Sequence, residues 1–133
     1  MGAVWTDQAK YQSWLEVELA ACEANCQLGK VPEDALAQIR KKASFQPDRI
    51  LQIELEVKHD VIAFLTNVNE HVGDSGRFIH VGMTSSDVLD TGLALQLTAS
   101  LRLLKKELKR LQAAITSLAK RHKNTSMIGR SHA

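Results

Sequence analysis

Residues 87–122 read DVLDTGLALQLTASLRLLKKELKRLQAAITSLAKRH, and this stretch decides the fold class. Large apolar side chains recur along it at steps of three and four residues. This spacing is close to the 3.5-residue repeat of helices that pack nearly parallel to one another. At about 1.5 Å per residue, the predicted helix is roughly 50 Å long. Its apolar seam consists of Leu93, Leu97, Leu101, Leu104, Leu108, Leu111, Ile115 and Leu118.

A seam of this length needs partner helices of similar length. The helical segments before residue 87 are too short to cover it, so we expect its partners later in a longer chain or in other subunits. Residues 127–133, MIGRSHA, gather glycine, arginine, serine and histidine as functional loops do. We therefore expect the sequence to be a fragment of a longer protein.

The residues before the seam predict shorter helices. No segment shows the alternation of a strand, so the predicted fold is all-α. We expect an N-terminal helical domain over residues 1–86 and the start of a bundle domain over residues 87–133. Capping residues and prolines set the helix starts, and glycines set the ends. The stretches run from Thr6 to Gly29, from Pro32 to about Lys42, and from Pro47 to Gly73 with a break near residues 58–60; a turn over residues 73–76 follows.

Composition and cysteine usage narrow the class of protein. With 133 residues, 44% hydrophobic and 24% charged, the chain has the profile of a soluble globular domain. No apolar run approaches membrane-spanning length, so we expect a cytoplasmic protein without a membrane partner.

Cys22 and Cys26 are four residues apart on one predicted helix, where a disulfide has poor geometry. We expect buried thiols, and no metal, because no second Cys/His pair has ligand spacing.

The charge is unevenly distributed along the chain. Residues 100–133 carry nine Lys/Arg and one Glu, a net of +8, whereas residues 1–99 carry eight Lys/Arg and fourteen Asp/Glu, a net of −6. A basic segment raises the possibility of nucleic-acid binding. However, these charges lie on an amphipathic helix, and no aromatic residue is interleaved to stack on bases. We therefore expect a solvated helix face and no nucleic-acid partner.

Residues 78–91, FIHVGMTSSDVLDT, have the composition of an anion-binding site. Gly82 allows a close approach of the backbone to a ligand, and Thr84 and Ser85 supply hydroxyl donors. The helix that follows offers unpaired N–H groups and the positive end of its dipole. Ser, Thr and Asp before an apolar run also form an ordinary helix cap, so the residues alone leave both interpretations open.

The histidines fall into two groups. His71 and His122 lie near predicted helix ends, where stabilisation of the helix dipole explains them. His59, His80 and His132 lie instead at breaks between helical segments, beside charged or hydroxyl residues. Each of these three is a candidate for a structural or a catalytic role.

Three segments resemble, in order, motifs of the adenylosuccinate lyases within the fumarase/aspartase superfamily. Residues 79–91 are similar to the family's first signature, residues 58–64 to its histidine segment, and residues 127–132 to its Gly-Arg-hydroxyl-His motif. Residues 5–7 and 14–18 fit the bacterial branch. The resemblance covers essentially the whole chain and implies a fumarase/aspartase-like fold and a homotetramer.

The resemblance also implies a reaction, the β-elimination of fumarate. Adenylosuccinate gives AMP, and a succinylated imidazole-carboxamide ribotide is split likewise, both in purine biosynthesis and without a cofactor or metal. Charge that develops on a substrate carboxylate requires preorganised donors, and the leaving nitrogen requires an acid that titrates near neutrality. The implied catalytic residues are His132, as that acid, and His59, which would orient or charge-stabilise the substrate. The implied substrate-binding residues are Lys58, His59, Asp60, His80, Thr84 and Ser85.

Parts of the family's site are absent from this sequence. Members usually begin earlier, with an Arg-Tyr pair that contacts the nucleotide, and their catalytic base lies on a serine-rich loop far downstream. Their active sites combine residues from several subunits. The resemblance therefore implies that the isolated chain is inactive. In addition, Ala133 replaces the glycine usual in the last motif.

Two alternatives remain open at this point. Carboxymuconate cycloisomerases of the same superfamily carry a similar Gly-x-Thr-Ser-x-Asp signature, although the segment around His59 favours the lyase. The chain could instead be a non-catalytic helical association module whose exposed seam binds partner helices.

Overall fold

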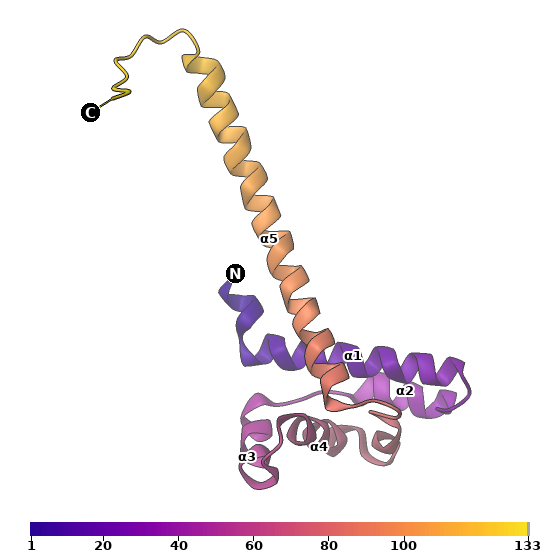
Figure 1. The fold of residues 1–133 in the computed structure, drawn as a ribbon. Helices are drawn as coiled ribbons and strands as arrows, with labels where there is room; N and C mark the ends of the chain where they lie inside the picture. Colours follow the sequence, from indigo (N-terminus) through magenta and orange to yellow (C-terminus); the bar gives the residue numbers. More distant parts are fainter. Residues whose placement is uncertain (133) are drawn as a thin grey trace. The chain divides into compact units, whose positions relative to one another are not determined.

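The computed structural model describes residues 1–132, and over these residues every regular element is a helix (Figure 1). The all-α prediction is confirmed. The chain divides into two compact units, Met1–Ala99 and Ser100–Ala133, with Ala133 itself outside the described residues. In chain order the elements are η1 (Gly2–Trp5), α1 (Asp7–Gln27), α2 (Glu33–Lys42), α3 (Pro47–Val57), α4 (Asp60–Val72), η2 (Gly73–Phe78) and α5 (Ser85–His122), where η denotes a 3-10 helix.

Local interactions cap both ends of α1, whereas α2 begins without a side-chain cap hydrogen bond. The Thr6 hydroxyl accepts a hydrogen bond from the Ala9 N–H at 3.2 Å, as expected of an N-cap. Helix α1 ends just before Gly29, whose φ of +70° is the left-handed conformation that glycine adopts most readily. Pro32 is the residue before α2 rather than its first residue, because its ψ of 145° is extended. The expected turn over residues 73–76 is part of the longer 3-10 helix η2.

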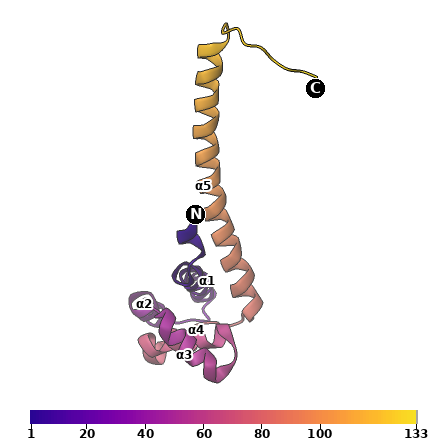
Figure 2. The same cartoon turned by 90° about the vertical axis from the view of Figure 1, so that its left-hand side faces the viewer.

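An aromatic cluster forms the centre of the first unit. Tyr11 of α1 stacks on Phe64 of α4 with ring centroids 5.9 Å apart, and Trp14 meets Phe64 edge-on at 5.5 Å. Figure 2, in which α1 is seen end-on, shows α2, α3 and α4 gathered on one side of it. All three aromatic side chains are buried, so this contact is the core that joins α1 to α4.

Helix α3 has one buried and one exposed face. The Leu51 side chain, near the start of α3, is 47% exposed. The buried face of α3 is formed instead by Ile50 and Ile53, three residues apart on the helix. Leu51 lines a surface hollow beside Leu55 and Lys58.

The first turns of α5 pack within the first unit. Val88 is fully buried, and Gly92 lies so close to Trp14 that a Cβ atom there would be 2.7 Å from the indole Cδ1. The Gln96 side chain donates a hydrogen bond to the Val4 carbonyl at 2.7 Å. Glycine is therefore required at position 92 for a close approach to a large aromatic side chain.

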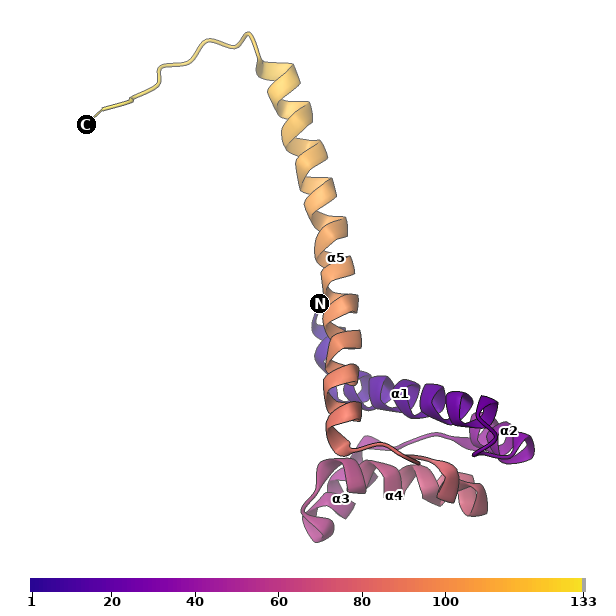
Figure 3. The same ribbon diagram turned by 45° about the vertical axis from the view of Figure 1, so that its right-hand side comes forward.

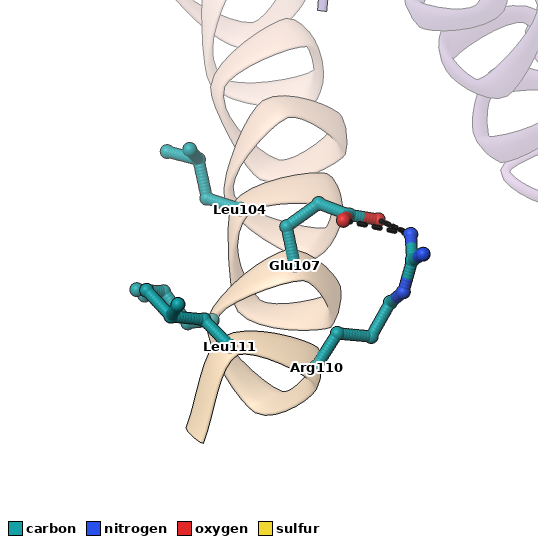
Figure 4. Close-up of a pocket in the computed structure, with 5 residues that line it drawn as sticks. Leu104, Glu107, Arg110 and Leu111 are labelled. Carbon is teal, nitrogen blue, oxygen red and sulfur yellow. Dashed lines mark hydrogen bonds and ion pairs between the residues drawn. The ribbon is translucent and has the colours of Figure 1, made fainter. Parts of the chain in front are cut away.

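The predicted seam of α5 is exposed along its whole length. Its eight apolar side chains are between 46% and 63% exposed. In the second unit, Figure 4 shows Leu104 and Leu111 beside a shallow hollow, with the Glu107–Arg110 ion pair at its other edge. Within the described part of the chain, no helix combines the length and apolarity needed to span a bilayer.

Candidate functional site

The break between α3 and α4 brings a cation, an imidazole and a carboxylate together at one helix start. Lys58 ends α3 in the left-handed conformation, with φ 54°. His59 is the N-cap of α4, and its Nδ1 accepts a hydrogen bond from the Ile62 N–H at 3.4 Å. Asp60 Oδ1 lies 3.4 Å from the same Nδ1. Nε2, the other ring nitrogen, has no hydrogen-bond partner among the described residues.

The second group of predicted site residues lies in the loop between η2 and α5, which Figure 3 shows as the link into the long helix. His80 has φ 67°, and its Nδ1 lies 2.6 Å from Oε1 of Glu18 on α1. The histidine side chain is 22% exposed, whereas the glutamate side chain is 1% exposed. His80 is therefore held by a contact that spans 62 residues of sequence.

Backbone strain marks both groups. Among residues 1–132, Lys58 and His80 are the only residues other than glycine with a positive φ. Such a backbone costs an L-residue about 1–2 kcal/mol, and a site without a functional constraint can relieve that cost with glycine. Both strained residues belong to the set that the sequence resemblance singled out for substrate binding.

The start of α5 is capped in a way that leaves two hydroxyl groups unused. The Thr84 N–H donates to Asp87 Oδ2 at 2.8 Å, and the Asp87 N–H donates to the Thr84 carbonyl at 3.0 Å. With these hydrogen bonds α5 begins at Ser85, two residues before the expected start at Asp87. No described residue hydrogen bonds to the hydroxyl of Thr84 or Ser85. The same segment can therefore cap α5 and still offer the hydroxyl groups of Thr84 and Ser85 as donors to a bound anion.

One face of α1 anchors this loop. Besides the Glu18 contact, the Cys22 thiol donates to the Phe78 carbonyl at 3.5 Å, and the Asn25 side chain donates to the Val81 carbonyl at 3.0 Å. Glu18 and Asn25 were not predicted from the sequence as site residues. The sequence did carry an indication of this contact. Positions 18, 22 and 25 share one face of α1, and a glutamate on an otherwise apolar helix face indicates a buried polar partner.

Burial controls the protonation of two groups on this face. It raises the pKa of the Cys22 thiol to about 11, and the charges of Glu18 and Glu23 add to the effect. Burial also raises the pKa of Glu18, against the opposing effect of its hydrogen bond to His80. The buried-thiol prediction is confirmed for Cys22, whereas Cys26 is only half-buried; both are unpaired.

The proposed acid lies apart in the sequence from these groups. His132 follows α5 in the second unit, with an exposed side chain, and its role stays a prediction. Within residues 1–132, no hydrogen bond or ion pair joins residues 58–60 to residues 80–85, so the structure gives two groups rather than one complete site. Over the same residues, no three His, Cys, Asp or Glu side chains form a cluster suited to a metal ion.

Comparisons with known proteins found a matching family model and similar curated proteins. The family model described as lyase matches residues 1–133. The chain is 60% identical over 132 residues to an adenylosuccinate lyase from Synechocystis sp., covering 99% of this chain and 31% of that relative. Other curated adenylosuccinate lyases are also covered over 31% of their length.

Solved structures agree on the fold. A fumarate lyase from Mesorhizobium sp. superposes with a TM-score of 0.89 at 28% identity, covering 98% of this chain and 31% of that one. A β-carboxy-cis,cis-muconate cycloisomerase from Acinetobacter calcoaceticus superposes with a TM-score of 0.88 at 24% identity, covering 98% and 32%. The second match supports the fumarase/aspartase-like fold and nothing about substrate.

Proposed function

The chain belongs to the lyase family, and from this premise we propose that the full-length protein containing it is an adenylosuccinate lyase. It would split adenylosuccinate into AMP and fumarate, and a succinylated imidazole-carboxamide ribotide likewise, as a cytoplasmic enzyme of purine biosynthesis. The observation that carries the choice of substrate is the 60% identity to the Synechocystis enzyme over almost the whole chain.

The first half of the proposed reaction needs hydrogen-bond donors to a developing negative charge. A base removes the proton next to a substrate carboxylate, which leaves a carbanion stabilised as an aci-carboxylate. The unused hydroxyls of Thr84 and Ser85, at the N-terminus of α5, would donate to that developing charge. Because the positive dipole end lies at the same place, it adds to the stabilisation.

The second half of the reaction breaks the C–N bond while an acid protonates the leaving nitrogen. His132 would be that acid. Lys58, His59 and Asp60 would contact the substrate, and His59 would orient or charge-stabilise it through its free Nε2. We assign no base to this chain. The base would come from the part of the protein that lies outside these residues.

We also propose a homotetramer built on the bundle that contains α5. The support is the row of apolar side chains, each 46% or more exposed, at the spacing of nearly parallel helix packing. Water contact with this much apolar surface is unfavourable, so helices of other subunits or of the remaining chain would cover it.

Fumarate release from adenylosuccinate by the full-length protein tests the proposal. We expect wild-type turnover, and a loss of about 10²–10⁴-fold in kcat for His132→Ala, since the general acid would be removed. His122→Ala is the matched control, because that exposed histidine at the end of α5 should be dispensable. Full turnover in His132→Ala would refute the acid assignment; absence of fumarate with the wild type would refute the proposed function.

The isolated chain provides a second test. Residues 1–133 should release no fumarate, because a base and the partner-subunit contacts would be missing. Turnover by this chain alone would contradict the proposed division of the site between segments.

A further inference from the structure

Glu18 occupies an unusual position for a carboxylate. It lies on the buried face of α1 with a side chain only 1% exposed, and its Oε2 is buried without a hydrogen-bond partner among the described residues. Burial of a carboxylate that is only partly hydrogen bonded is costly, and glutamate is rarely buried unless it is paired. A glutamine or an apolar residue would suit a purely structural position better.

The partner of Glu18 is His80. The 2.6 Å separation of Oε1 and Nδ1 is at the short end for a nitrogen–oxygen hydrogen bond, which is typical when one group is charged. When Glu18 is ionised its carboxylate can only accept, and Nδ1 of the imidazole then carries the proton of this hydrogen bond. The pairing thus fixes both the orientation of the ring and the nitrogen that carries its proton.

The other ring nitrogen is available to a ligand. Nε2 of His80 has no hydrogen-bond partner among the described residues, and it is not among the buried polar atoms without a partner. The ring is therefore anchored at one nitrogen from the protein interior and accessible at the other. An anion at Nε2 requires a proton on that nitrogen; with Nδ1 also protonated the ring is an imidazolium, and the carboxylate of Glu18 would compensate its charge.

The surrounding contacts maintain this arrangement. Cys22 and Asn25, on the same face of α1, bind the carbonyl groups of Phe78 and Val81 on either side of His80. They hold the loop while His80 keeps its strained φ of 67°. A left-handed histidine that is fixed by a buried carboxylate is a pre-organised group rather than a surface side chain.

We propose that Glu18 is a positioning residue that holds His80 with its Nε2 presented to an anionic group of the substrate. This inference rests on the proposed function, since it assigns Glu18 a part in the binding of adenylosuccinate. It differs from a packing role, because it acts through His80 alone.

Steady-state kinetics of the full-length protein separates the two roles. Glu18→Gln keeps the shape of the side chain but removes the charge. We expect KM for adenylosuccinate to rise about 10- to 100-fold, with a much smaller change in kcat, because the contact binds the substrate and its transition state alike. Glu16→Gln is the matched control: Glu16 is on the same helix but exposed, and KM should not change.

A double substitution tests whether the effect passes through His80. In a His80→Gln background, Glu18→Gln should raise KM no further, because the coupled pair has already been broken. An equal rise in both backgrounds would overturn the proposal, and so would an unchanged KM in a folded Glu18→Gln variant.

A third measurement uses the wild-type protein, so its outcome does not depend on whether a variant folds. Nitrogen-15 spectra of the full-length wild type with labelled histidine should show His80 Nδ1 protonated. A bare Nδ1 would contradict the proposal. If the wild type releases no fumarate, the proposed function and the substrate role both fail, while these spectra still decide whether Glu18 and His80 pair as described.

Discussion

Lys58 and His80 carry a backbone conformation that L-residues avoid, at the two places where motif residues gather. Each left-handed residue costs about 1–2 kcal/mol relative to the ordinary conformation. Neighbouring contacts must maintain this strain, and for His80 the Glu18 contact and the α1 anchors do so. Strain that coincides with side chains suited to anion binding is typical of functional sites.

A substitution of Lys58 should separate stability from activity. Lys58→Gly relieves the left-handed strain but adds freedom to the unfolded chain, so we expect a net gain of about 0.5–1 kcal/mol in stability. Fumarate release should fall, because the ammonium group is lost. Urea unfolding and a turnover assay of the full-length protein measure the two effects.

The control for this variant is Lys42→Gly at the last residue of α2. Lys42 has an ordinary helical backbone, so glycine there should reduce stability by up to about 1 kcal/mol and leave activity intact. Destabilisation by Lys58→Gly would contradict the strain argument.

The two cysteines should differ in reactivity. Cys22 is buried with its pKa raised to about 11, so at pH 8 only about one thiol in a thousand is the reactive thiolate. We expect a disulfide-exchange reagent to label half-buried Cys26 first and Cys22 only when the chain opens. Cys22→Ser and Cys26→Ser isolate the two rates, and equal rates in the folded variants would refute this account.

At the scale of the elements, helix caps and breaks, which depend on neighbouring residues, could be predicted. Contacts between residues far apart in the sequence could not. The caps and breaks at Thr6, Pro47 and residues 58–60 depend on neighbouring residues, and they were predicted. The Glu18–His80 contact joins positions 62 residues apart, and no local pattern encodes it. The exposure of Leu51 could not be predicted either, because an apolar residue at a helix start gives no sign of which face is covered.

The pairing of α3 with α4 should weaken in acid. Arg49 donates hydrogen bonds to Glu70, with a shortest nitrogen–oxygen distance of 2.7 Å, and Asn67 donates to the same carboxylate at 3.0 Å. The hydrogen bond from Arg49, followed by that from Asn67, holds the pKa of Glu70 below its ordinary value. A depressed pKa in the folded state means stabilisation that is present above the unfolded value and lost as the pH falls through the folded one.

Glu70→Gln should therefore be less stable than the wild type at pH 7, and the difference should vanish at pH values below the folded pKa of Glu70. Urea unfolding at a series of pH values measures it. The control is Glu16→Gln, since exposed Glu16 forms no ion pair among the described residues and its replacement removes none. A Glu70→Gln penalty that persists at low pH would show that packing, not the charged contact, is responsible.

At the scale of the whole molecule, the chain corresponds to only part of the proteins that it resembles. It spans 31% of the length of the curated relatives it matches. The motif resemblance predicted the family, which the comparisons confirm, because three short motifs in order are specific even when no complete site is present. The oligomer and the division of the active site stay predictions, because they depend on residues outside this chain.

The seam should drive association. We expect Leu104→Lys combined with Leu111→Lys to dissociate the full-length assembly, because two charges would be buried between packed helices. Ala113→Lys with Ser117→Lys is the matched control, since these residues lie on the polar part of α5 beside Lys109 and Lys120. Sedimentation across a concentration series measures the change, and an unaltered assembly in the leucine variant would contradict the role of the seam.

The proposed function is tested most sharply by a product analysis of the full-length protein offered adenylosuccinate and 3-carboxy-cis,cis-muconate in parallel. An adenylosuccinate lyase should form AMP and fumarate in equal amounts from the first compound and leave the second unchanged. Turnover of the muconate without release of fumarate from adenylosuccinate would contradict the proposed lyase function.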